Sequence, residues 1–212
     1  MLPVPLSGKE LDRVFKQPIP KYFTQAEVVR ILSANAHDLR AYLVVNTLWK
    51  TGLRCSEMLS LKKEALDPYG KLLRVKTLKQ GEKKKPYAGV GRRPKAEKSA
   101  KEVERILPIP DDLVTGLLAW IHSSENGAET LFHFSRPTAF RIVRKACERA
   151  GLDDSRAHPH SFRHAYAVHL LREGVPITIL KELLGHSNIA STLVYLRITQ
   201  PDKRAIFDQV QW

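Results

Sequence analysis

The sequence is poor in the residues that mark disulfide-rich secreted domains and membrane proteins. Its 212 residues include two cysteines, Cys55 and Cys147, which form neither a disulfide framework nor a metal-binding pattern. No apolar run approaches the roughly 20 residues that span a bilayer. Residues 1–20 lack the charged-then-apolar order of a signal peptide. These absences favour a protein of the reducing cytoplasm with no membrane partner.

Acidic residues are scarce relative to basic ones. The chain has 35 Lys and Arg against 22 Asp and Glu, for a net charge of +13 at pH 7. Such an excess favours a polyanionic partner, with DNA or RNA ahead of an anionic membrane surface. A basic protein without a polyanionic partner is the alternative, because charge alone does not exclude it. The length and a hydrophobic content of 43% allow one substantial domain with a packed core, with or without a small appendage.

Residues 158–195 concentrate side chains that suit phosphate chemistry: His160, Arg163, His186 and Tyr195. The planar guanidinium of an arginine matches the oxygens of a phosphate. Imidazole moves protons near neutral pH. A tyrosine hydroxyl, with an ordinary pKa of roughly 10, becomes a nucleophile when another group takes its proton. Together these groups suit attack on a phosphodiester without a metal.

The local pattern predicts that these side chains converge. One helix is expected over residues 161–172 and another over residues 177–184, each followed by a glycine that suits a helix end. Ser187 is a candidate N-cap for a last short helix that carries Tyr195. Three short helices joined by tight turns would bring the four side chains to one pocket.

Each signal is weak alone, because a lone histidine or a tyrosine on an amphipathic helix is usually a packing residue. The ordered combination is more specific: H-S-F-R-H, then L-L-G-H, then a tyrosine nine residues after that histidine. It resembles the second conserved box of the tyrosine recombinases, the phage integrase family that includes Xer-type and small invertase-type members. The run R-H-x-x-A-x-H-L-L that starts at Arg163 matches as well, and Phe162 replaces the commoner leucine.

A second segment resembles the first conserved box of the same family. Residues 51–61 read T-G-L-R-C-S-E-M-L-S-L and place Arg54 at a helix N-terminal turn, where backbone N–H groups also favour an anion. In isolation Arg54 would be an ordinary surface arginine. Two boxes in the right order and separation make it a candidate catalytic residue. The resemblance implies that Glu57 is a supporting carboxylate that orients an arginine or a histidine.

Strands are expected over residues 72–78 and 103–109, joined by a loop rich in Lys, Arg and Gly. The resemblance implies a catalytic lysine near the end of the first strand. Lys79 fits this place best, and Lys76, Lys98 and Lys101 compete with it. The basic side chains of the loop and of the expected helix over residues 138–150 could also bind DNA phosphates. The alternative is that they form a surface that contacts only solvent. The predicted DNA-binding residues are Lys83, Lys84, Lys85, Arg92, Arg93, Arg141 and Arg144.

The resemblance covers roughly residues 22–198 and implies a mainly α-helical fold with a small antiparallel sheet. We expect an N-terminal arm or linker over residues 1–20 and a catalytic domain over residues 21–198. A tail helix over residues 199–212 would follow, and it could be exchanged between subunits. The family's separate N-terminal DNA-binding domain is not expected in this sequence, which would be either a compact stand-alone recombinase or a fragment of a longer protein.

The function implied by the resemblance is site-specific DNA recombination through a 3′-phosphotyrosyl intermediate. Two arginines would hold the non-bridging oxygens, and His186 would hydrogen-bond the phosphate. His160 would accept the tyrosine proton or position the phosphate, and Lys79 would protonate the leaving 5′-oxygen. The expected catalytic set is Arg54, Lys79, His160, Arg163, His186 and the nucleophile Tyr195.

Neither a metal nor a cofactor is expected. The expected partners are double-stranded DNA and further copies of the chain, as a dimer on each site and a tetrameric synapse, with accessory proteins left open. Two alternatives stand beside recombination: DNA relaxation of the type IB topoisomerase kind, and a DNA-binding module without catalysis.

Overall fold

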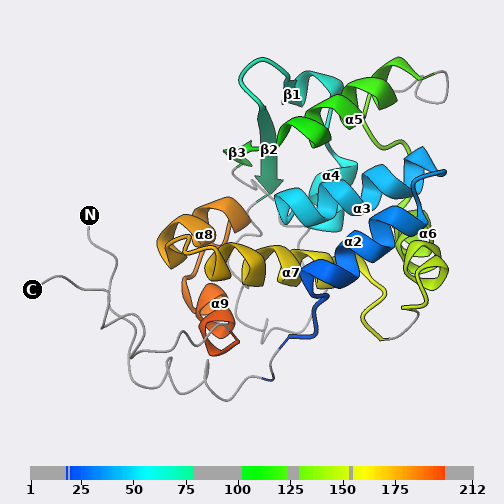
Figure 1. Cartoon of the computed structure of the whole chain (residues 1–212). Coiled ribbons are helices and arrows are strands. Elements are labelled where there is room, and N and C mark those ends of the chain that lie inside the picture. The colour runs from blue at the N-terminus through cyan, green and yellow to red at the C-terminus, as the bar shows by residue number, and fades with distance from the viewer. Residues whose placement is uncertain (1–17, 19, 79–101, 124–128, 153–154, 199–212) are drawn as a thin grey trace, which may run out of the picture.

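The computed structural model describes residues 18, 20–78, 102–123, 129–152 and 155–198 (Figure 1). Helices come first, a small sheet interrupts them, and helices complete the fold, which confirms the expected mainly α-helical class. The elements in chain order are α2 (Gln25–Ala34), α3 (Leu39–Thr51), α4 (Cys55–Leu59), η1 (Lys63–Ala65), β1 (Leu66–Asp67), β2 (Leu72–Leu78), β3 (Glu102–Pro108), α5 (Asp111–His122), α6 (Arg136–Arg149), α7 (Pro159–Arg172), α8 (Ile177–Leu184), α9 (Ala190–Leu193) and η2 (Val194–Arg197).

Helix α3 is the central element of the core. It contacts α5, α6 and α7, and Figure 1 shows it between α5 and α7. The helix begins where the Asp38 carboxylate accepts a hydrogen bond from the N–H of Ala41, at 3.0 Å. Leu43 and Leu48 are fully buried, and full burial of such side chains stabilises a fold by roughly 1.5–3 kcal/mol each. The helix therefore holds its C-terminal end, where the candidate site begins, in a fixed position.

The sheet is antiparallel, in the order β1-β2-β3. Side chains alternate between its faces, so that Leu73 and Val75 of β2 are buried while Arg74 and Lys76 are exposed. Thr77 belongs to the buried face by the same alternation. In the register of the two strands Val75 lies opposite Arg105, so β3 directs Arg105 to the interior as well. Thr77 and Arg105 thus lie at the end of an otherwise apolar face, and their polar side chains need a polar partner there.

The last helices differ from the expectation in where they begin and in helix type. The predicted N-cap Ser187 was wrong, because α9 begins later, at Ala190, whose N–H donates to the Asn188 side chain at 2.8 Å. Tyr195 lies on η2, a 3₁₀ helix, and not on an α-helix. An Asx turn at Asn188 thus displaces the start of the helix. The predicted helix over residues 177–184 agrees with α8, and the predicted helix over residues 161–172 begins two residues earlier, at Pro159.

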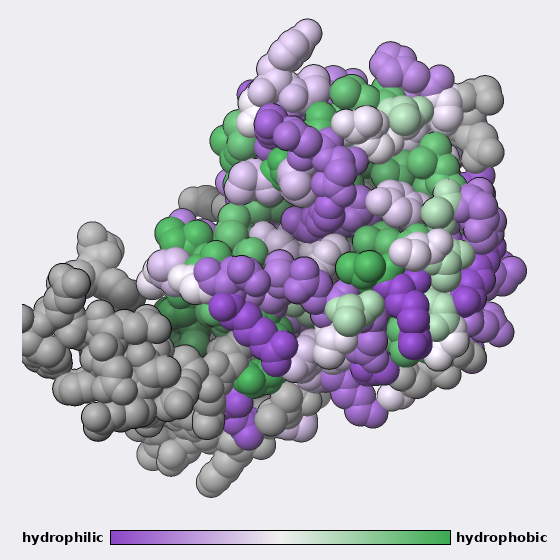
Figure 2. All heavy atoms as spheres, in the orientation of Figure 1, coloured by the Kyte–Doolittle hydropathy of each residue, from purple (hydrophilic) through white to green (hydrophobic). Residues whose placement is uncertain are grey.

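Several expected segments lie outside the described residues. They are nearly all of the arm over residues 1–20, the strand-joining loop from residue 79 to residue 101, and the tail over residues 199–212. In the described parts of the chain no helix is both long and apolar enough to cross a bilayer. Figure 2 shows one face of the molecule, on which hydrophilic residues are interspersed with smaller apolar patches.

Gly52 ends α3 with a positive φ of 60°, and a methyl group there would meet a ring carbon of Tyr166 at 2.3 Å. We expect Gly52→Ala to lower the free energy of unfolding by about 3 kcal/mol or more, because backbone strain and overpacking add. Gly151→Ala is the control, since Gly151 has a φ of 66° with nothing within 4 Å of the added carbon. Gly151→Ala should lower the free energy of unfolding by only about 1 kcal/mol. Equal losses in urea denaturation would contradict the packing argument.

Candidate functional site

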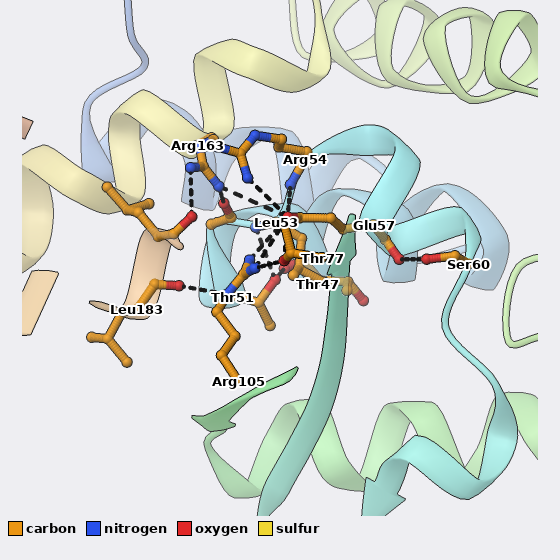
Figure 3. Close-up of polar contacts among 12 residues, drawn as sticks. Thr47, Thr51, Leu53, Arg54, Glu57, Ser60, Thr77, Arg105, Arg163 and Leu183 are labelled. Atoms are coloured by element: carbon orange, nitrogen blue, oxygen red, sulfur yellow. Dashed lines mark hydrogen bonds and ion pairs between the residues drawn. The ribbon is translucent and has the colours of Figure 1, made fainter. Parts of the chain in front are cut away.

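A buried carboxylate lies at the centre of the site. Glu57 of α4 is only 5% exposed and accepts hydrogen bonds from three side chains (Figure 3). One oxygen accepts from Arg54 Nη1 at 2.9 Å, from Thr77 Oγ1 at 2.9 Å and from Arg105 Nη1 at 3.0 Å. The other accepts from the Arg54 backbone N–H at 2.8 Å and from Arg105 Nη2 at 2.9 Å. Glu57 therefore fixes residues from α4, β2 and β3 around one charge.

The charge of Glu57 is retained despite its burial. Burial alone would raise its pKa, but the hydrogen bonds and charge of Arg105, together with Arg54, lower it to about 2. The carboxylate is thus ionised at neutral pH. A buried charge of this kind persists only with close and well-oriented partners, and the bidentate Arg105 supplies them.

Arg105 is a site residue that the sequence argument missed. Its guanidinium bonds to Glu57 and Thr77, and its Nε donates to the Leu183 carbonyl of α8 at 3.1 Å. A methyl group on Gly185 would lie 2.7 Å from its Nη1. Arg105 therefore links β3 to the end of α8, directly before His186. Strand alternation offers one signal, because Arg105 shares a strand face with the apolar Leu107, but the pattern does not identify its partner.

The two arginines of the sequence motifs differ in accessibility. The Arg54 side chain is 34% exposed at the start of α4. Arg163 of α7 is buried, and its Nη1 and Nη2 donate to the carbonyls of Gly52 at 2.6 Å and Leu184 at 2.7 Å. Burial first, then the charge of Arg54, lowers the pKa of Arg163 to about 10, which leaves it charged at neutral pH. Figure 3 shows both guanidinium groups on the same side of Glu57.

His186 follows the left-handed Gly185 that ends α8. Its Nδ1 lies 2.9 Å from the hydroxyl oxygen of the buried Thr192. When that hydroxyl donates, the ring proton sits on Nε2, which can then donate to a ligand. Burial, followed by the charges of Arg163 and Arg54, lowers the pKa of His186 to about 3. The imidazole is therefore neutral at pH 7.

Tyr195 is 2% exposed, so its hydroxyl lies inside the protein. That hydroxyl is 2.8 Å from Nδ1 of His164, and the two ring centroids are 5.7 Å apart. Burial raises the pKa of Tyr195, whereas the charges of Arg163 and Arg54 act to lower it. The phenol consequently lies within electrostatic reach of both arginines. His164 was noted in the sequence only as a neighbour of Arg163, and its contact with Tyr195 depends on the packing of η2 against α7.

His160 occupies the first turn of α7 and is exposed. Its ring stacks on that of His164 with centroids 6.3 Å apart. Burial of part of the ring lowers the pKa of His160, and so do nearby positive charges, including those of Arg163 and Arg136. Arg136, which the sequence analysis did not single out, thus adds an exposed cation at the start of α6.

The remaining predicted residues lie on α6, on β2 or outside the described residues. Arg141 and Arg144 are exposed on α6, and Arg141 Nη2 donates to Thr138 Oγ1 at 3.1 Å. Lys76, a competitor for the catalytic lysine, is exposed on β2. Those outside the described residues are Lys79, Lys83, Lys84, Lys85, Arg92, Arg93, Lys98 and Lys101.

Taken as chemistry, the site offers ordered cations, neutral imidazoles and a phenol. Arg54 and Arg163 can bind the oxygens of a phosphodiester, and His186 can add a neutral donor. The negative charge that grows on the phosphorus oxygens during attack is the charge such groups stabilise. The burial of Tyr195 means that its hydroxyl or its surroundings must move before it reaches a phosphate in a duplex.

The chain is similar to known proteins over most of its length. Residues 21–201 match the model of the phage integrase family. A tyrosine recombinase of Pseudothermotoga lettingae is 32% identical over 203 residues, which cover 94% of this chain and 63% of that protein. The crystal structure of XerA recombinase superposes with a TM-score of 0.68 at 24% identity, covering 93% of this chain and 68% of that one. A structure of XerH recombinase bound to palindromic difH substrate in a post-cleavage complex gives a TM-score of 0.66 at 17% identity, with coverages of 90% and 52%. The chain spans about three fifths of the length of the curated relatives it matches.

The charge of Glu57 predicts a specific acid response. Its folded-state pKa of about 2 lies below the ordinary 4.5, so its stabilisation is complete above pH 4.5 and is lost as the pH falls toward 2. We expect Glu57→Gln to lower the free energy of unfolding at pH 7 by about 3 kcal/mol. The deficit relative to wild type should shrink below pH 4.5. Glu129→Gln, at an exposed ion pair with Lys62, is the control and should show almost no deficit. Urea titrations between pH 7 and pH 3.5 that gave a constant Glu57→Gln deficit would contradict this assignment.

Proposed function

The chain belongs to the phage integrase family, and we therefore propose that it is a site-specific recombinase that cuts and rejoins duplex DNA. The observation that supports this most strongly is the arrangement of Arg54 and Arg163 around buried Glu57, with the Tyr195 hydroxyl within reach of both positive charges. Such an arrangement suits a bound phosphodiester and a tyrosine nucleophile.

In the proposed reaction the Tyr195 oxygen attacks the scissile phosphorus, and the bond from phosphorus to the 5′-oxygen breaks. Arg54 and Arg163 stabilise the charge on the non-bridging oxygens, while neutral His186 donates a hydrogen bond. His160 accepts the tyrosine proton or positions the phosphate, and Lys79 gives a proton to the leaving oxygen. The 3′-phosphotyrosyl bond retains the energy of the phosphodiester. A 5′-hydroxyl from another strand can therefore reverse the reaction without ATP.

The proposed partners are double-stranded DNA and further copies of the chain. The structure of the Tn1549 transposon integrase in complex with transposon right end DNA, which has a similar fold, supports a DNA ligand. We propose one dimer on each site and a tetramer during strand exchange, with residues 199–212 available for exchange between subunits. Candidate phosphate contacts are exposed Arg141 and Arg144, together with the basic loop from residue 79 to residue 101.

The comparisons favour recombination over DNA relaxation of the type IB topoisomerase kind, because the matched family and the named relatives are recombinases. A module that binds DNA without cutting it has no use for a tyrosine nucleophile, and it would keep all of its activity in Tyr195→Phe.

Covalent trapping tests the proposal. Nicked duplexes carrying the DNA that flanks the gene should give a protein–DNA band that survives denaturing electrophoresis. Tyr195→Phe should abolish the band while native gels still show DNA retention, because the nucleophile alone is lost. Tyr69→Phe is the control, since Tyr69 is 97% exposed, and it should react as wild type does. Retention without a covalent band in the wild type would contradict the catalytic proposal.

The role of Arg54 predicts a loss of rate. Replacement by lysine keeps the positive charge but removes the planar fork that bonds both to Glu57 and to phosphate. Arg54→Lys should slow formation of the covalent band by about 100-fold or more. Arg74→Lys, an exposed change on β2, should leave the rate within about twofold of the wild type. Equal rates for the two variants would exclude Arg54 from transition-state stabilisation.

A further inference from the structure

The Tyr195 hydroxyl has a specific partner outside the expected catalytic set. His164 Nδ1 lies 2.8 Å from the tyrosine oxygen, within hydrogen-bond distance. The two residues are 31 positions apart, and the contact joins α7 to η2. His164 directly follows Arg163 on α7, so one turn of helix presents both the buried guanidinium and the imidazole that meets the phenol.

We propose that His164 is a catalytic residue that holds the Tyr195 hydroxyl and receives its proton during attack on phosphorus. This inference rests on the proposed function and deepens it, because it moves the task of proton acceptor from His160 to His164. His160 then serves the phosphate, from its exposed place in the first turn of α7.

The geometry favours His164 for this task. Its imidazole is partly buried and lies against the tyrosine ring, with ring planes 51° apart. The ring of His160 stacks on the ring of His164, so that His164 contacts rings on two sides. A proton acceptor must lie within hydrogen-bond distance of the proton it takes, and the Nδ1 atom of His164 meets this condition before any substrate arrives.

The charge state of His164 suits an acceptor. Burial first, then His160 and Arg163, lowers its pKa to about 4, so the ring is neutral at pH 7 and has a free lone pair. Such a ring is a weak base in the free protein, because burial and the nearby positive charges oppose its protonation. A phosphodiester bound to Arg54 and Arg163 brings a negative charge that makes the protonated imidazole more favourable. Substrate binding would thus strengthen the base at the step where it is needed.

The O–H bond of Tyr195 breaks, its proton moves to Nδ1 of His164, and the oxygen forms a bond to phosphorus. The bond from phosphorus to the 5′-oxygen breaks, and that oxygen takes a proton from the lysine proposed above. In the reverse direction His164 returns its proton to the departing tyrosine.

Two histidine variants separate proton transfer from simple positioning. In His164→Asn the side-chain oxygen can replace Nδ1 as a hydrogen-bond acceptor, but the amide does not take a proton. We expect single-turnover cleavage of a nicked duplex to fall by about 100-fold or more, with unchanged DNA retention. His169→Asn, on the same helix with its ring against Trp49, is the matched control and should cleave within about twofold of the wild type. Near-normal cleavage by His164→Asn would overturn the proposal.

A second measurement does not require DNA. Nitrogen-15 NMR of the histidine rings in the free full chain should show His164 neutral at pH 7, with its proton on Nε2 and a bare Nδ1. Tyr195→Phe should shift the Nδ1 resonance, because the hydroxyl is removed. A proton on Nδ1 in the wild type would make His164 the donor and would overturn the proposal.

The two measurements also separate this inference from the proposed function. A wild-type chain that retains DNA but never forms the covalent product would contradict both the proposed function and the role of His164. If the wild type cleaves normally but Nδ1 of His164 is protonated, or the His164→Asn variant is active, only the role of His164 is contradicted. His160 would then be the proton acceptor.

Discussion

The ion cluster around Glu57 is the interaction on which the rest of the site depends. One buried carboxylate orients Arg54 on its own helix and binds Arg105 on β3 through both oxygens. Arg105 then reaches the end of α8 through the Leu183 carbonyl. A buried charge is tolerated only when its partners are all in place, so the cluster forms when the sheet and the helices are packed together. Folding of the core and assembly of the site are consequently one event.

This arrangement explains how the site can be ordered and yet closed. Arg163 donates hydrogen bonds to the carbonyls of Gly52 and Leu184, and these bonds fix the plane of its guanidinium. Arg54 remains partly exposed to solvent. Tyr195 is buried against His164. A phosphate would meet Arg54 first, and the tyrosine would engage only after a local rearrangement.

Much of the fold followed from the sequence, because capping residues and apolar periodicity act locally. The expected strand over residues 72–78 and the expected helix over residues 177–184 formed as the local pattern indicates. Arg105 could not be placed in the same way, because its partner Glu57 is 48 positions away and meets it only through the strand register. The contact of His164 with Tyr195 depends on how η2 packs on α7, which no local pattern encodes. The roles of the predicted site residues stay predictions.

The most direct test of the account is to identify the residue that becomes attached to DNA. After reaction of the wild-type chain with a nicked duplex, nuclease and protease digestion would leave a short nucleotide on one peptide, which mass spectrometry can sequence. We expect a 3′-phosphate linked to Tyr195. Attachment to another residue, or a 5′-linkage, would contradict it.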